Sequence, residues 1–307
     1  MKGIFYSTIT LIFIVPIVFF AFVYLDAARS AAEGSTAKAI GDKIISFSKS
    51  VDSDLPRTMD IVVKRSVEAN VKYIEENGVP LDNAEARITE AMTNGTVFGN
   101  STVLNNFTIT SWANTLNAKG GRYGFNTNIG IISINITPLD SYTIVVGVII
   151  SVNVSHPTGE TSLYRVYDTE IPVSIEGQID PLYMLNTNGL LKRTIEPPNI
   201  TVYGAANFDA AVAREYYMQS QGGPSFLDRL EGRLVSKYAN ATNIGLETFV
   251  FVPELQANGL TVKPNQNSID FLYFNSSTHS GQQVNSSAYS WLRLNNEQAA
   301  RYGVTLI

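Results

Sequence analysis

The chain has 307 residues, a formal net charge of −5 and no cysteine. Without cysteine there is no disulfide, thiolate metal site or cysteine nucleophile, so a disulfide-stapled secreted module is excluded. The mild acidity, together with the absence of any cluster of five or more basic residues, argues against nucleic acid as a partner. The length is enough for one large or two small domains besides a membrane anchor.

The first pattern in the chain is an apolar segment, residues 4–25, that contains no charged residue. As a helix with a rise of about 1.5 Å per residue it would be roughly 30 Å long, enough to cross the hydrocarbon core of a bilayer. Lipid-embedded helices tolerate a proline such as Pro16, and Tyr6 and Tyr24 fit the aromatic belts at the two membrane surfaces. We therefore expect one transmembrane helix over residues 4–25, with membrane lipid as its partner.

The charge before this segment predicts its orientation. Lys2 and the amino terminus precede it, and positive charge favours the cytoplasmic side of the plasma membrane. Residues 1–3 would then be a cytoplasmic tail, and the chain from Asp26 onward would be extracellular. The alternative is a cleaved signal peptide, for which Ser30-Ala31-Ala32 supplies small residues at the cleavage site.

Acceptor sequences for N-glycosylation, Asn-x-Ser/Thr, support the outside assignment. There are nine of them, all beyond residue 93 and none with proline in the middle position. Such acceptors are modified on exposed loops and surfaces of exported proteins, so we expect a glycoprotein. The nine acceptor residues are Asn94, Asn100, Asn106, Asn135, Asn153, Asn199, Asn240, Asn275 and Asn285.

Residues 26–93 are expected to form a helical stalk. Apolar residues recur at spacings of three and four over residues 40–55 and again over residues 59–74, which predicts one buried stripe on each helix. Pro56 interrupts the pattern, and we expect it in the first turn of a second helix with Asp54 as the N-cap. Asp82 is expected to cap a third, short helix. The stripe would pack either on a partner helix or on the protein's own globular part, and the spacing leaves both open.

Residues 94–196 are expected to form an antiparallel β-sheet part of the extracellular domain. A short strand is predicted at 107–110 and a short helix around Trp112 and Leu116. Apolar and polar residues then alternate over 132–137, 142–155 and 167–175, with short polar links between them, which is typical of an antiparallel meander.

Residues 199–307 are expected to form a second, α+β part after a linker at Pro197-Pro198. Helices are predicted at 208–218 and 224–235, followed by strand-like segments and a last helical turn at 296–301. The strand-like segments are 248–252, 269–274 and 289–294. The predicted fold class is therefore α+β, with an N-terminal transmembrane helix, a helical stalk and an antiparallel β-sheet ectodomain with added helices.

Residues that carry chemistry are few. His156 and His279 have no second ligand at metal-binding spacing, so no metal and no cofactor are expected. Glu170, Glu176 and Asp180 flank a strand end and could form a glycosidase-type pair or a calcium site, although exposed strand and turn carboxylates explain them as well. A second charged group is interpreted as solvated charge on one helix, and no enzyme is predicted. That group consists of Asp228, Arg229, Glu231 and Arg233.

Three phrases resemble uncharacterised membrane-anchored surface proteins of methanogenic archaea: residues 175–183 (IEGQIDPLY), 224–227 (PSFL) and 269–274 (IDFLYF). This resemblance implies an archaeal cell-surface protein and carries no known chemistry. The N-terminal order of a tail ending in Lys2-Gly3, a long apolar helix and an amphipathic extension also resembles type IV pilin-like proteins.

The pilin resemblance implies two properties of the N-terminus. Gly3 would be the site where a peptidase removes a short leader, and the apolar helix would join copies or pilin-like partners in a filament or secretion machine. The sequence departs from the pilin pattern in two ways: the leader would have only three residues, and the fifth residue after Gly3 is Thr8, where a glutamate often lies.

The sequence as a whole predicts a single-pass membrane-anchored surface protein with a structural or adhesive role, which includes the pilin-like case. The alternative is an ectodomain that binds a small ligand or a polysaccharide. A third option, an anchored hydrolase, would need a cleft that gathers carboxylates which are scattered in the sequence.

Overall fold

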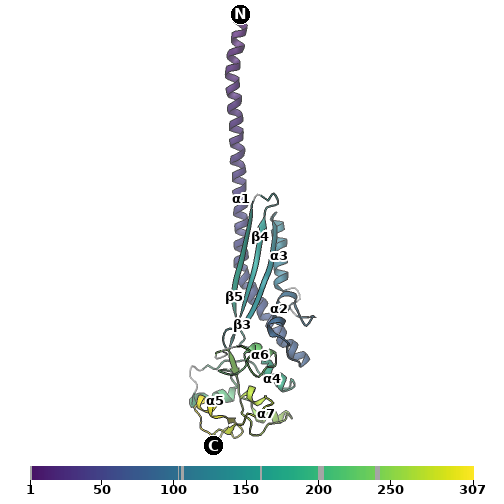
Figure 1. The fold of residues 1–307 in the computed structure, drawn as a ribbon, viewed down its shortest axis with the longest axis vertical. Coiled ribbons are helices and arrows are strands. Elements are labelled where there is room, and N and C mark those ends of the chain that lie inside the picture. Colours follow the sequence, from purple (N-terminus) through teal and green to yellow (C-terminus); the bar gives the residue numbers. More distant parts are fainter. Residues whose placement is uncertain (1, 103, 105–106, 160, 200–203, 239–242) are drawn as a thin grey trace. The chain divides into compact units, whose positions relative to one another are not determined.

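A computed structural model describes residues 2–102, 104, 107–159, 161–199, 204–238 and 243–307. The fold is α+β, with a long apolar N-terminal helix and small antiparallel sheets (Figure 1). The chain divides into two compact units. The first comprises residues 1–54, 114–130 and 151–167, and the second comprises 55–113, 131–150 and 168–307.

Helix α1, Lys2–Asn77, is one continuous helix of 76 residues. The apolar stripe predicted for the stalk is buried from Ile44 to Ile74, and its buried members recur at the spacings of three and four that the sequence shows. This chain itself covers the stripe, so no partner helix is needed to bury it.

The helix break predicted at Pro56 is wrong, because α1 continues through that position. Proline in a helix interior removes one backbone hydrogen bond and costs about 3 kcal/mol. Leu55 and Met59, on either side of it, are 1% and 0% exposed, so burial of the stripe offsets this cost. Asp54 accordingly lies inside the helix instead of capping a new one.

Helix α2, Ala84–Asn94, begins one residue later than predicted. The N-cap is Asn83, whose side chain accepts a hydrogen bond from the amide of Ala86. Asp82 instead accepts hydrogen bonds from the guanidinium of Arg87, at 2.9 and 3.1 Å. A two-stranded antiparallel pair follows, β1 Thr96–Val97 and β2 Asn100–Ser101.

Helix α3, Ile109–Arg122, replaces the strand predicted at 107–110. Thr108 lies just before it, and its hydroxyl accepts a hydrogen bond from the amide of Ser111, as an N-cap side chain does. Gly120 allows α3 to lie against the following strand, because a Cβ there would be 2.2 Å from the side chain of Thr127.

The largest sheet has the strand order β3-β4-β5, and Figure 1 shows the three strands side by side. Their bounds are β3 Asn126–Pro138, β4 Thr143–Ser155 and β5 Ser162–Ser174. The links between them are too short for a parallel crossover, so the neighbours are antiparallel, as predicted.

Alternation holds along β4, where every second residue from Ile144 to Val154 is buried, and it fails in β3. In β3 the buried residues Ile129 and Ile136 are seven positions apart, an odd number, so the alternation shifts by one residue between them. For this reason Ile132, predicted to share the buried face, is 56% exposed.

The rest of the second unit consists of short elements. Six helices lie there among the described residues: α4 Pro181–Asn186, α5 Ala205–Arg214, α6 Phe226–Leu230, α7 Val252–Ala257, α8 Asp270–Tyr273 and α9 Asn296–Tyr302. Two antiparallel pairs join them, namely β6 Met218–Ser220 with β7 Gly245–Glu247 and β8 Gln282–Gln283 with β9 Arg293–Leu294.

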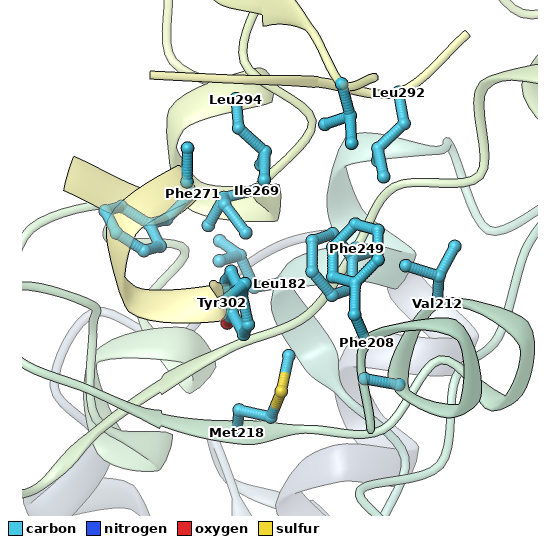
Figure 2. Close-up of a cluster of buried hydrophobic side chains, with 13 residues drawn as sticks. Leu182, Phe208, Val212, Met218, Phe249, Ile269, Phe271, Leu292, Leu294 and Tyr302 are labelled. Atoms are coloured by element: carbon cyan, nitrogen blue, oxygen red, sulfur yellow. The ribbon is translucent and has the colours of Figure 1, made fainter. Parts of the chain in front are cut away.

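Two of the elements predicted for this part are confirmed: the helix at 208–218 as far as Arg214, by α5, and the last helical turn at 296–301, by α9. The helix predicted over 224–235 is limited to the five residues of α6, and the strand predicted at 269–274 is a helical turn, α8. A hydrophobic cluster joins these short elements, and Figure 2 shows Phe208, Phe249 and Tyr302 meeting at its centre.

Candidate functional site

A polar pocket of about 580 Å³ lies in the second unit. Four elements supply its walls: β6, β7, α8 and α9. Amide side chains are the most frequent kind among the residues that line it. The lining residues are Gln219, Ser220, Gln221, Gly222, Asn243, Glu247, Phe271, Leu272, Asn295, Glu297, Gln298 and Arg301.

The hydrophobic cluster holds these walls in place. Met218, Phe271 and Tyr302 are buried in the cluster, as Figure 2 shows, and each either lines the pocket or precedes or follows a lining residue. The short elements that line the pocket are thereby fixed by their other side chains, which pack in the cluster. The pocket wall is therefore preformed.

Glu247 is the buried acid of the pocket, with 0% of its surface exposed. The hydroxyl of Ser220 donates to its Oε2 at 2.6 Å, the hydroxyl of Tyr302 donates to Oε1, and Nη1 of Arg301 lies 3.1 Å from Oε1. Burial raises the pKa of Glu247 more than Arg301 and these hydroxyl donors lower it. Because both carboxylate oxygens have partners, the arrangement suits a fixed binding group better than a free proton donor.

Two glycines allow the backbone to close beneath Glu247. A Cβ on Gly245 would lie 2.4 Å from the carbonyl oxygen of Gly223, and a Cβ on Gly223 would lie 2.6 Å from the carbonyl oxygen of Leu246. Such distances are far below van der Waals contact, so only glycine fits at either position. The close approach brings β7 to the segment after β6 at the base of the pocket.

Beside the pocket, a second buried group of charges surrounds Arg229. Its Nη1 lies 2.7 Å from Oδ2 of Asp180 and 2.8 Å from Oδ2 of Asp270, and its Nη2 donates to the carbonyl of Leu246. The hydroxyl of Tyr217 donates to Oδ2 of Asp180 at 2.8 Å. Burial raises the pKa of Asp270 and outweighs the lowering by Arg229, whereas the two carboxylates raise the pKa of Arg229 against the effect of burial.

The interpretation of Asp228, Arg229, Glu231 and Arg233 as solvated helix charge is wrong for the first three: Asp228 and Arg229 are fully buried, and the side chain of Glu231 is only 7% exposed. Asp228 closes a capping box with Ser225 at the start of α6, and this burial is possible because each of its oxygens accepts a hydrogen bond. Arg233 does remain half exposed. Of Glu170, Glu176 and Asp180, the two glutamates are exposed, as the interpretation as strand and turn carboxylates predicts, whereas Asp180 is buried against Arg229.

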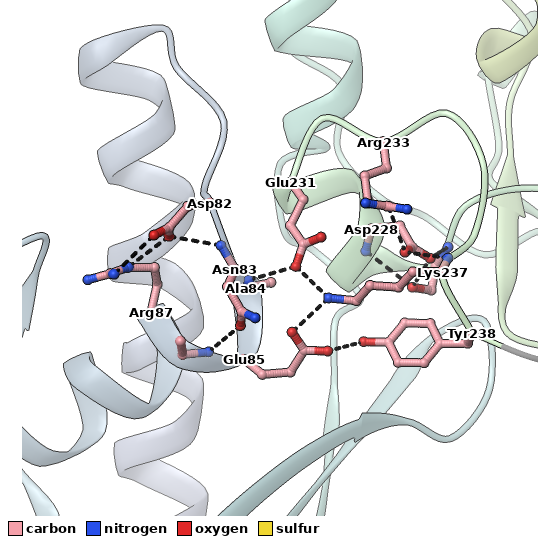
Figure 3. Close-up of polar contacts among 12 residues, drawn as sticks. Asp82, Asn83, Ala84, Glu85, Arg87, Asp228, Glu231, Arg233, Lys237 and Tyr238 are labelled. Atoms are coloured by element: carbon pink, nitrogen blue, oxygen red, sulfur yellow. Dashed lines mark hydrogen bonds and ion pairs between the residues drawn. The ribbon is translucent and has the colours of Figure 1, made fainter.

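A third polar network joins α2 to the segment after α6, as Figure 3 shows. The amide of Ala84 donates to Glu231 at 2.8 Å, and Lys237 bonds both Glu85, at 2.7 Å, and Glu231. Burial alone would raise the pKa of Glu85, but hydrogen bonds from Lys237 and Tyr238 outweigh it and lower that pKa. This network is structural, since it caps α2 and leaves none of these groups directed into the pocket.

The acceptor asparagines differ in exposure. Asn275 is half-buried, and Asn106 and Asn240 lie outside the described residues. The other six are exposed on the surface, as modification requires: Asn94, Asn100, Asn135, Asn153, Asn199 and Asn285. Over the described ranges, no group of three or more histidine, aspartate or glutamate side chains has an arrangement that could hold a metal ion.

Sequence reasoning missed the pocket because its residues are spread from Gln219 to Arg301 without a recurring spacing. Comparison of the chain with protein-family models, with curated proteins and with solved structures finds no match.

Proposed function

We propose that this chain is a single-pass membrane-anchored protein of the cell surface, with a structural or adhesive role. The N-terminal part of α1 would lie in the membrane and the second unit would be displayed outside. The observation that carries the proposal is the exposure of α1: every described side chain from Ile14 to Ala39 is exposed. The large apolar side chains between residues 14 and 25 are 46–75% exposed.

Water is an unfavourable surrounding for such a surface. Each Å² of apolar surface left in water costs about 25 cal/mol, and soluble monomers rarely expose contiguous apolar patches of this kind. The helix is also long and apolar enough to cross a bilayer. Lipid is the partner whose chemistry fits all sides of this segment at once, because the apolar side chains surround the helix instead of forming one stripe.

Continuity of α1 favours a retained anchor over a cleaved signal peptide. Residues 30–32, the candidate cleavage site, lie within the helix, and the same helix is part of the folded protein from Ile44 onward. An anchor that continues into the fold would keep the second unit attached to the membrane, as a display role requires. The pilin-like case needs one further step, cleavage after Gly3, which would free the helix to pack against its copies.

Peptide mass spectrometry of the protein purified from its native membrane tests this proposal. We expect an N-terminus at residue 1 or 2 and glycan mass on exposed acceptors such as Asn135 or Asn153. An N-terminus at Ile4 would place the chain among filament subunits. An N-terminus between residues 31 and 34 would contradict the anchor, and unmodified asparagines throughout would remove the main support for the outside location.

A further inference from the structure

We propose that the pocket formed by β6, β7, α8 and α9 binds a short, uncharged saccharide. The inference adds a ligand to the surface role proposed above. It rests on that role only for the place of binding, which would be the cell exterior. Binding itself depends on the pocket residues alone, so the two proposals can fail separately.

Gln298 is the first observation that points to a ligand. Its side chain is only 8% exposed, yet it lines the pocket. Oδ1 of Asn267 accepts from the amide of Ile269 at 3.0 Å, so Nδ2 of Asn267 must be the atom that donates to Oε1 of Gln298, at 3.2 Å. Nε2 of Gln298 is then left without a hydrogen-bond partner within the described ranges, in a side chain that lines the pocket. This amide nitrogen is open to solvent, so it is free to donate a hydrogen bond to an acceptor from outside.

Other amides surround the same space. Oδ1 of Asn295 accepts a hydrogen bond from the backbone N–H of Gln298, and Oδ1 of Asn243 accepts one from Nε2 of Gln219. Both amide groups are thereby oriented, and both line the pocket beside Gln221. A sugar hydroxyl donates one hydrogen bond and accepts others, and an amide does the same, so this lining matches a polyhydroxylated ligand.

Charge selects among such ligands. Glu247 is paired with Arg301, whereas Glu297 is exposed at the rim of the pocket, so the lining carries an excess of negative charge. Acidic sugars and phosphorylated ligands would be repelled. Phe271 and Leu272 add an apolar surface that fits the C–H face of a sugar ring, and the volume of about 580 Å³ is within the usual range of small-ligand pockets.

The test uses the full chain in lauryldimethylamine oxide, a detergent without a sugar headgroup, so that the detergent does not occupy the pocket. An array of neutral and acidic glycans identifies candidates, and saturation-transfer NMR with the best free disaccharide measures affinity. We expect one or more neutral glycans to bind and glucuronate-containing glycans to bind more weakly or not at all.

Variants locate the site. Gln298→Met removes the side-chain donor of Gln298 at similar size, and Gln221→Ala removes an exposed rim amide without touching the core. We expect each to weaken binding roughly three- to tenfold, the range of one lost hydrogen bond. Gln256→Ala, an exposed glutamine on α7, is the matched control and should bind like the unsubstituted chain.

Three results would overturn the proposal: no neutral glycan bound on the array, tighter binding of acidic glycans, or equal affinity in the Gln221→Ala and Gln256→Ala variants. Gln221→Ala keeps the test valid if Gln298→Met fails to fold. None of these results depends on whether α1 lies in a membrane.

Discussion

Nη1 of Arg229 lies 2.7 Å from Oδ2 of Asp180, and neither side chain has any exposed surface. Asp270 approaches the same nitrogen at 2.8 Å. One guanidinium thus joins α4, α6 and α8. The three phrases at 175–183, 224–227 and 269–274 overlap these helices. Asp180 lies in the first phrase and Asp270 in the third, and Arg229 follows the second by two residues. Two of the phrases thus supply the carboxylates of one buried charge cluster, and the remaining phrase ends close to its arginine.

Replacing Arg229 by methionine should destabilise the second unit by about 3–5 kcal/mol, because two buried carboxylates lose their shared cation. Urea denaturation of the full chain, followed by the fluorescence of Trp112 and Trp291, both in the second unit, measures the change. Arg233→Met is the control, since that side chain is 48% exposed and 3.9 Å from its carboxylate, and it should change the free energy of unfolding by less than about 1 kcal/mol.

Neutralising the whole cluster should restore much of the loss. In a chain with Asp180→Asn and Asp270→Asn added to Arg229→Met, no buried charge is left without a partner. The triple variant should therefore unfold at a higher urea concentration than the single variant. Equal stability of the single variant and the Arg233→Met control would mean that the cluster does not hold these helices.

Alanine at Gly245 should cost about 2–3 kcal/mol in the free energy of unfolding. Its Cβ would lie 2.4 Å from the carbonyl oxygen of Gly223, and backbone cannot move aside as a side chain can. Gly222→Ala is the matched control, because a Cβ there meets no heavy atom within 4 Å, and we expect a change of less than about 1 kcal/mol. Thermal unfolding of both variants measures the difference, and equal melting temperatures would contradict the close approach.

The lowered pKa of Glu85 predicts a loss of stability in acid. A carboxylate with a folded pKa below the unfolded value of 4.5 contributes stability that is fully present above that value. This contribution is lost as the pH falls from 4.5 through the lowered folded pKa. Urea titrations at several pH values should show a smaller loss across this window for Glu85→Gln than for the unsubstituted chain.

Glu76→Gln serves as the control for that titration. Glu76 is 62% exposed and pairs with Lys72 only at 3.6 Å, so its removal should leave the acid dependence unchanged. A Glu85→Gln variant that follows the unsubstituted chain at every pH would mean that the bonds from Lys237 and Tyr238 add no stability. Glu247, whose pKa is raised, works in the opposite direction: its contribution is complete below 4.5 and is lost as the pH rises through the folded pKa.

A charge in the apolar segment should weaken membrane insertion. Val15→Lys places an ammonium group within the expected span, which costs about 2.5–3.5 kcal/mol near the centre of a transmembrane helix. Carbonate-washed membranes should retain less of this variant than of Ala37→Lys, which puts the same charge on α1 beyond the span. Equal retention of the two variants would show that residues 4–25 are not the anchor.

The parts that sequence could predict are those with a strong local period. The stripe of α1 and the alternation of β4 involve many residues in one regular pattern, and both are confirmed. The break at Pro56 was wrong because burial of the stripe outweighs one missing hydrogen bond. The strand at 269–274 was wrong because Asp270 accepts hydrogen bonds from the amide of Thr248 and pairs with Arg229, contacts 22 and 41 residues away in sequence.

The pocket could not be predicted for a related reason. Glu247 and Gln298 are surrounded by short elements of two to seven residues, which have too few residues to show a period. Their burial depends on contacts distant in sequence, such as those of Ser220 with Glu247 and of Asn267 with Gln298. A signal was present only in composition, as a high density of asparagine and glutamine after residue 218.

The central claim is that α1 anchors the chain with its second unit outside, and labelling of a single cysteine tests it most directly. The chain has no cysteine, so Gln256→Cys introduces one thiol at an exposed position of α7. A membrane-impermeant maleimide is added to intact cells and, separately, to permeabilised cells. We predict equal labelling in both samples and none in the unsubstituted chain. Labelling that appears only after permeabilisation would place the second unit inside the cell and contradict the account.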